Sequence, residues 1–179
     1  MIYMFLAEGF EEVEALAPLD LIRRAGLEIK TVGVGSKVVV GSHGIPVTAD
    51  ITVDEFLDDT PDMVILHGGM PGTKNLDANA TVHKAIADAV KNDAYVCAIC
   101  AAPFILGKRG ILKGKRATCF PGFEKYLEGA EVVDAGVVRD GNIITGRAMG
   151  SAHEFALTIL EALKGKDAAE EMKKTIILK

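Results

Sequence analysis

Short runs of apolar residues alternate along this chain with segments whose apolar residues recur every three or four positions. The apolar runs predict strands at residues 1–6, 27–34, 62–66, 95–99, 115–118, 131–133, 136–139 and 142–145, and shorter ones at 37–41 and 45–49. The helical spacing predicts helices at residues 11–24, 53–57, 80–92, 102–109, 122–127, 150–163 and 167–173. Glycines predict a loop at residues 68–72, and Asp140-Gly141 predicts a hairpin turn.

This alternation is typical of α/β proteins. Strands that are apolar without interruption are buried on both faces, which implies a mainly parallel sheet with helices on each side. A length of 179 residues without a linker, repeat or low-complexity tract predicts a single domain over residues 1–179. Ligands of such sheets bind at the carboxyl ends of the strands, so candidate chemistry is expected where strands end.

Composition narrows the range of partners. The net charge is −5 and Lys and Arg are dispersed, so specific nucleic-acid recognition is not expected. Although 49% of the residues are hydrophobic, no apolar run is long enough to span a bilayer. The apolar start at residues 1–6 is short and lacks the basic flank of a signal peptide. We therefore expect a cytoplasmic protein that does not act at a membrane.

Three cysteines, an odd number in a chain without an export signal, argue against a disulfide framework. Cys97 and Cys100 have Cys-x-x-Cys spacing, but no second pair follows to complete a zinc site. A thioredoxin-like motif requires its second cysteine inside a helix, which disfavours that interpretation. Cys97, within an apolar strand, is expected to be inert core. We expect neither a metal nor a cofactor.

Cys100 lies where the apolar strand at 95–99 ends and the next helix begins. A thiol at this point is close to the amide dipoles of a helix N-terminus, which favour negative charge and therefore the thiolate. Because the thiolate is the nucleophilic form of cysteine, Cys100 is the first candidate for chemistry.

Gly68 and Gly69 follow the buried strand at 62–66. Paired glycines allow the backbone to turn sharply and to expose its N–H groups. The amides of Gly69 and Ala101 are candidates for an oxyanion hole, although most glycine pairs mark only a turn.

Glu14 lies on the first predicted helix, in one stripe with Phe10, Pro18 and Leu21. A carboxyl group among apolar neighbours loses solvation, so its pKa rises and it becomes able to donate a hydrogen bond to a thiolate. The alternative is a surface acid like its neighbours. Pro18 cannot donate to the carbonyl of Glu14, so we expect the helix to bend or loosen there.

Four further residues have two interpretations each. His43, in a turn, is either catalytic or simply exposed, and His67 either lines the pocket or ends its strand. Cys119 begins a loop near the strand ends and is either a second oxidisable thiol or structural. Arg147 either attracts an anion or forms a surface or interface salt bridge.

Taken together, several segments resemble the ThiJ/PfpI superfamily, most closely the branch that contains the parkinsonism-associated protein deglycase. The resemblance covers essentially the whole chain. The segments that carry it are residues 8–14, 23–26, 66–69, 98–103, 146–147 and 154–157.

The resemblance implies a flavodoxin-like three-layer sandwich and a homodimer. It also implies that Cys100 is the nucleophile, that Glu14 is the acid bonded to its sulfur, and that Gly69 and Ala101 are backbone donors. In such proteins the turn that holds His43 approaches the cysteine from the side.

Activities assigned to the family are glyoxalase III, which converts methylglyoxal to lactate, deglycation of proteins or nucleotides, oxidative-stress sensing, holdase chaperoning and, in a distant branch, peptidase activity. One departure bears on them: many active members have a histidine where this chain has Phe120, before Pro121. Phenylalanine cannot relay protons, which disfavours a Cys-His peptidase.

Two functions are therefore carried forward, a thiolate enzyme acting on reactive carbonyls and a non-enzymatic oxidative-stress sensor or chaperone that uses the same cysteine. A glutamine amidotransferase is disfavoured because it requires glycines around the cysteine and a spaced His-x-Glu pair, whereas His153 and Glu154 are adjacent.

Overall fold

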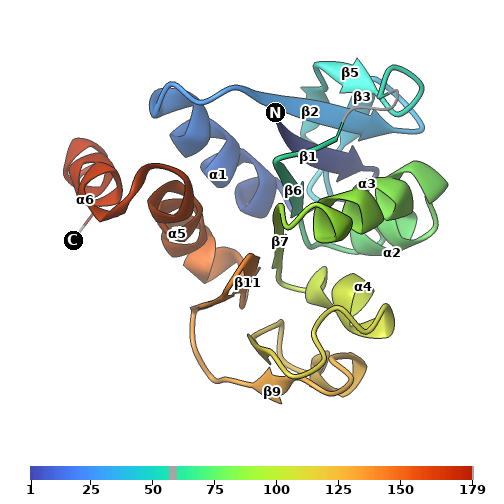
Figure 1. Ribbon diagram of the computed structural model, residues 1–179. Helices are drawn as coiled ribbons and strands as arrows, with labels where there is room; N and C mark the ends of the chain where they lie inside the picture. The colour runs from blue at the N-terminus through green and yellow to red at the C-terminus, as the bar shows by residue number, and fades with distance from the viewer. Residues whose placement is uncertain (57–59, 179) are drawn as a thin grey trace.

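A seven-stranded sheet runs through the computed structural model, which describes residues 1–56 and 60–178 (Figure 1). Its order is β10-β11-β7-β6-β1-β2-β5, and neighbours are parallel except for the antiparallel pair β10 and β11. The strands are β1 (Ile2–Ala7), β2 (Ile29–Val34), β5 (Ile51–Thr52), β6 (Met63–Leu66), β7 (Tyr95–Ile99), β10 (Val137–Asp140) and β11 (Ile143–Gly146).

The register of the central strands brings the segments that follow β1, β6 and β7 together at the carboxyl-terminal edge of the sheet. Leu66 of β6 pairs with Phe5 of β1 on one side and with Ala98 of β7 on the other. Because these strands are parallel, the segments that follow β1, β6 and β7 leave the sheet side by side. All of β1 and β6 is buried, which is why both are apolar without interruption.

Helices cover both faces of the sheet (Figure 1). On one face, α1 (Glu12–Arg24) and α5 (Ala152–Lys164) pack on alternate side chains of the central strands. On the other face lie α2 (Gly72–Asp77), α3 (Ala80–Lys91) and α4 (Pro103–Lys108). A further helix, α6 (Lys166–Thr175), packs against α5 on the outside. This arrangement confirms the three-layer α/β prediction.

Two small sheets lie outside the main one. One pairs β3 (Val38–Val40) with β4 (Pro46–Thr48) as an antiparallel hairpin, and the other pairs β8 (Arg116–Ala117) with β9 (Glu131–Val132) in parallel. Short 3₁₀ helices occur at η1 (Glu124–Tyr126) and η2 (Met149–Ser151).

Some predicted elements were wrong. A helix was predicted at 53–57, but residues 53–55 form a turn and residue 57 lies outside the described residues. The helix predicted at 122–127 is only the three-residue η1. Neither α2, which follows the glycine loop, nor β5 was predicted. The helix α1 continues through Pro18 to Arg24.

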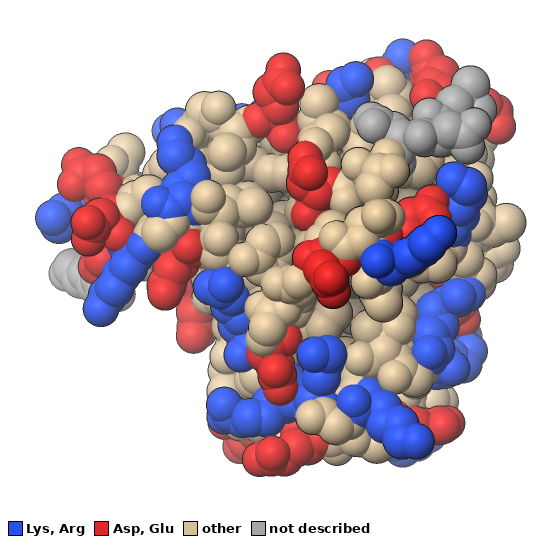
Figure 2. Space-filling view, viewed as in Figure 1, with Lys and Arg blue, Asp and Glu red and all other residues tan. Residues whose placement is uncertain are grey.

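Acidic and basic side chains are interspersed over the face shown in Figure 2. In the part of the chain that the structure describes, no helix combines the length and the apolar character needed to cross a membrane.

Candidate active site

Cys100 occupies a sharp elbow between β7 and α4. Its φ of 64° lies in the left-handed region, which non-glycine residues rarely adopt. Two backbone hydrogen bonds hold it there: its N–H donates to the carbonyl of Gly146 at 2.9 Å, and its carbonyl accepts from the N–H of Phe120 at 2.8 Å. The surrounding backbone therefore imposes the conformation that directs this thiol out of the strand.

Three groups converge on the sulfur of Cys100. The backbone N–H groups of Gly69 and Ala101 donate hydrogen bonds to it, and a further hydrogen bond joins it to the side chain of Glu14. Gly69 follows β6, Ala101 follows β7, and Glu14 lies in the first turn of the helix that follows β1. The parallel register of these strands is what assembles the cluster.

Glu14 is almost fully buried, with 1% of its surface exposed. Its Oε2 accepts a hydrogen bond of 3.0 Å from the N–H of Gly68, and the backbone N–H of Met149 also donates to its carboxyl group. Burial is the main reason why the pKa of Glu14 rises to about 7. Glu11 caps the helix by accepting from the N–H of Glu14 at 2.7 Å, which fixes the first turn.

The expected lowering of the pKa of Cys100 needs a correction. Burial raises the pKa of this thiol, the negative charge of Glu14 raises it further, and the amides of Gly69 and Ala101 only partly oppose them. The helix α4 has only six residues, so its dipole is small. The dipoles that favour the thiolate are those of the two amides that contact the sulfur. Two adjacent negative charges in a buried site repel, so Glu14 and Cys100 retain one proton between them near neutral pH.

Gly68 is required by the close approach of two side chains. A Cβ atom at this position would lie 2.3 Å from Oε2 of Glu14 and 2.9 Å from Sγ of Cys100. Gly68 therefore allows the carboxyl group and the sulfur to approach the same peptide.

His67 is fully buried, so it ends the strand and does not open into a pocket. Its Nδ1 lies 2.7 Å from the carbonyl oxygen of Gly68, and its Nε2 accepts from the N–H of Ala7 at 3.2 Å. Burial lowers the pKa of His67 to about 4, which keeps the ring neutral.

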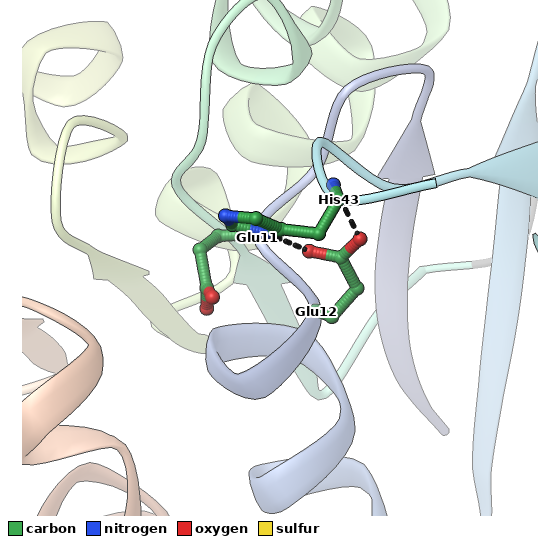
Figure 3. Close-up of side chains that lie close together, drawn as sticks. All are labelled: Glu11, Glu12 and His43. Atoms are coloured by element: carbon green, nitrogen blue, oxygen red, sulfur yellow. Dashed lines mark hydrogen bonds and ion pairs between the residues drawn. The ribbon is translucent and has the colours of Figure 1, made fainter. Parts of the chain in front are cut away.

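His43 is paired with Glu12, a contact that the sequence did not suggest (Figure 3). The N–H and Nδ1 of His43 lie 2.7 and 2.8 Å from the two carboxylate oxygens of Glu12. Burial raises the pKa of Glu12, but the hydrogen bonds from His43 outweigh it and hold that pKa at about 2. The His43 side chain is 71% exposed, so this residue is the exposed turn histidine of the two alternatives.

Glu11, Glu12 and His43 each offer one ligand atom within 4.8 Å of the others. Their observed hydrogen bonds account for this closeness, because Glu11 caps α1 and Glu12 binds the turn that holds His43.

The remaining candidates lie beside the elbow. Cys119 is buried, and its pKa rises to about 11 because of burial and the charge of Glu124. Phe120 is 43% exposed and bonds the Cys100 carbonyl through its own N–H. Arg147 forms an ion pair with Asp134, the salt-bridge alternative.

Comparison with known proteins identifies a family. The model of the DJ-1/PfpI family matches residues 1–162. The chain belongs to the DJ-1/PfpI family. It is 36% identical over 181 residues to the Parkinson disease protein 7 homolog of Danio rerio, covering 98% of this chain and 96% of that protein.

Two other DJ-1/PfpI relatives bear on the chemistry. The glutathione-independent glyoxalase DJR-1.2 of Caenorhabditis elegans is 31% identical over 173 residues, covering 96% of this chain and 92% of that one. The structure of oxidized Toxoplasma gondii DJ-1 superposes with a TM-score of 0.94 at 28% identity, covering 98% of this chain and 97% of that chain. The flavodoxin-like fold implied by the sequence is confirmed.

Proposed function

We propose that this protein is a cysteine-dependent enzyme that converts reactive carbonyl compounds such as methylglyoxal to hydroxy acids such as lactate. The observation that carries the proposal is the convergence of Glu14, Gly69 and Ala101 on the sulfur of Cys100. A nucleophile, two oxyanion donors and a carboxyl group with a pKa near 7 are the parts that such a reaction needs. The C. elegans relative named as a glyoxalase supports the same chemistry.

The first step is addition. Glu14, as carboxylate, accepts the proton of the Cys100 thiol, and the thiolate so formed attacks the aldehyde carbon of methylglyoxal. A C–S bond forms, and the aldehyde oxygen becomes the oxyanion of a hemithioacetal. The amides of Gly69 and Ala101 stabilise this negative charge as it develops.

The second step is an internal redox rearrangement. Glu14 first gives its proton to the hemithioacetal oxygen and becomes a carboxylate. It then removes the hydrogen of the former aldehyde carbon as a proton and returns it to the ketone carbon, while the hydroxyl proton of the hemithioacetal passes to the ketone oxygen. The aldehyde carbon is oxidised to a thioester while the ketone is reduced to an alcohol. Water then hydrolyses the thioester, releasing lactate and regenerating the Cys100 thiol, so no external oxidant or reductant is consumed.

Lactate production from methylglyoxal tests the proposal. Cys100→Ser should abolish it, because a hydroxyl group is a far weaker nucleophile than a thiolate. Cys97→Ala is the matched control, since Cys97 is a fully buried core residue that precedes the elbow. A Cys100→Ser protein as active as the parent would refute the enzyme.

A second candidate is an oxidative-stress sensor or holdase chaperone that uses the same cysteine. Phe120 favours it, because a residue without a titratable group beside the elbow cannot relay protons for turnover. The oxidized state named for the T. gondii relative also supports it. Two successive reactions of Cys100 with peroxide would give sulfenic and then sulfinic acid, each releasing water.

Intact-mass measurement after peroxide treatment distinguishes the two candidates. A gain of two oxygen atoms that disappears in Cys100→Ser, with no turnover of methylglyoxal or of glycated protein or nucleotide, would favour the sensor. Turnover without preferential oxidation of Cys100 would favour the enzyme.

Homodimerisation and a cytoplasmic location complete the proposal. Three apolar side chains are exposed in segments near the first turn of α1: Val13, Ile45 and Met149. Such a group of exposed apolar side chains supports a homodimer, in which a second copy of the chain would cover them. Light scattering should give twice the mass of the chain, and Val13→Glu should reduce it to one chain. A monomeric parent would contradict the dimer, and cell fractionation tests the location.

A further inference from the structure

His67 makes two hydrogen bonds inside the protein and reaches no solvent. Its Nε2 lies 3.2 Å from the backbone nitrogen of Ala7, at the end of β1. Its Nδ1 lies 2.7 Å from the carbonyl oxygen of Gly68. A buried imidazole with both nitrogens satisfied has a fixed orientation.

The partners of His67 also fix its tautomer. The Ala7 nitrogen is a donor, so Nε2 must be the unprotonated acceptor. The single proton of the neutral ring is therefore on Nδ1, which donates to the Gly68 carbonyl. Burial keeps this ring neutral, since the pKa of His67 falls to about 4.

The carbonyl that His67 holds belongs to the same peptide group as the amide of Gly69. A peptide group is planar, so fixing the direction of its C=O fixes the direction of its N–H. The N–H of Glu11 also donates to this carbonyl, at 3.0 Å. The residues on both sides of this peptide are glycines, which restrict its rotation less than other residues would, and Gly69 has a φ of 86°.

We propose that His67 is a positioning residue that clamps the Gly68–Gly69 peptide so that the Gly69 amide points at the sulfur of Cys100. Two donors on the carbonyl also polarise the peptide and strengthen its N–H as a donor. The inference deepens the proposed function and rests on it for the role of the Gly69 amide in turnover. The effect of the clamp on the ionisation of Cys100 does not depend on whether the protein turns over methylglyoxal.

Two variants separate the clamp from general packing. The side-chain amide of His67→Asn places an N–H near the position of Nδ1, so it retains the donor to Gly68 and loses the acceptor for Ala7. The longer side chain of His67→Gln places an oxygen near the position of Nε2, so it retains the acceptor for Ala7 and loses the donor to Gly68. Each variant loses one buried hydrogen bond, so similar losses of stability are expected.

The primary readout is the pH dependence of Cys100 alkylation by iodoacetamide, which reports the thiolate. In His67→Gln the pH of half-maximal alkylation should rise by about one pH unit, because a misdirected Gly69 amide stabilises the thiolate less. In His67→Asn it should stay close to that of the parent. The kcat for methylglyoxal should fall about tenfold or more in His67→Gln, with little change in KM.

The outcomes separate the two proposals. If the parent produces no lactate, the glyoxalase fails while alkylation still tests the clamp. Equal alkylation profiles in the Asn and Gln variants would overturn the clamp. Should either variant fail to fold, long-range ¹H–¹⁵N NMR of the unaltered protein decides: a proton on Nδ1 of His67 supports the clamp, and a proton on Nε2 overturns it.

Discussion

The N–H of Gly68 donates a 3.0 Å hydrogen bond to Oε2 of Glu14, the carboxyl group that also bonds the Cys100 sulfur. A methyl group at position 68 would lie 2.3 Å from that oxygen, well inside van der Waals contact. Gly68→Ala should therefore lower kcat/KM for methylglyoxal about 100-fold or more, because it displaces both groups that the proposed mechanism uses without removing either.

Gly150→Ala is the matched control for Gly68→Ala, since a Cβ at position 150 meets no atom within 4 Å. It should retain the activity of the parent. Full activity of Gly68→Ala with an unchanged fold would show that the Glu14–Cys100 contact is not needed for turnover.

Phe120→His should raise turnover of methylglyoxal. Residue 120 is bonded through its backbone to Cys100 and is half-exposed, so an imidazole there has both access to the site and room to exchange protons. General acid–base catalysis makes a gain of about tenfold or more reasonable. Phe123→His, in the neighbouring aromatic cluster, should leave kcat unchanged. Equal kcat values for the parent and both variants would exclude a relay from position 120.

Glu14 and His67 should give the stability of the fold opposite pH dependences. The pKa of Glu14 rises from 4.5 to about 7, so its contribution is full below pH 4.5 and is lost as the pH rises through 7. The pKa of His67 falls from 6.5 to about 4, so its contribution is full above pH 6.5 and is lost as the pH falls towards 4. Each contribution is about 3.5 kcal/mol in full, at about 1.4 kcal/mol for each pKa unit.

Urea denaturation at pH 4.5 and pH 7 measures the two contributions separately when it is applied to variants that lack one of the two groups. Of these two contributions, Glu14→Gln leaves that of His67, so its free energy of unfolding should be lower at pH 4.5 than at pH 7, by about 2.5 kcal/mol from His67 alone. His67→Asn leaves that of Glu14, so relative to the parent its stability should fall more steeply as the pH rises from 4.5 to 7. The same pH trend relative to the parent in both variants would contradict the assigned pKa directions.

His43→Ala should lower stability but not activity. The buried Glu12 carboxylate loses its hydrogen bond from the imidazole and keeps the one from the backbone N–H, so Tm should fall by a few degrees, while lactate formation should stay within about twofold of the parent. His153→Ala, at an exposed helical histidine, is the control for both measurements. Loss of turnover in a folded His43→Ala protein would assign His43 to catalysis instead.

The sequence predicted the central strands well because they are buried on both faces, which leaves a continuous apolar run. It missed α2, whose sequence GTKNLD has only one large apolar residue and whose first amide bonds Gly9 across the structure. It overestimated the segment after Thr52, where the Glu55 side chain accepts from the N–H of Thr52 and closes a turn.

In the candidate site, too, some features could be predicted from the sequence and others could not. Cys100, Gly69 and Ala101 were predictable because each follows a strand end. The Met149 amide on Glu14 was not, because a backbone donor 135 positions away leaves no pattern in the sequence. The raised pKa of the thiol was missed for a related reason, since desolvation depends on tertiary packing and not on spacing.

The left-handed elbow at Cys100 also has a thermodynamic consequence. At most positions an alanine stabilises a fold relative to a glycine, but at a φ of 64° the preference reverses. A Cys100→Gly protein should therefore unfold at a higher urea concentration than Cys100→Ala, although both lack the sulfur. A cysteine at this point therefore holds the chain below the stability that a glycine would give it.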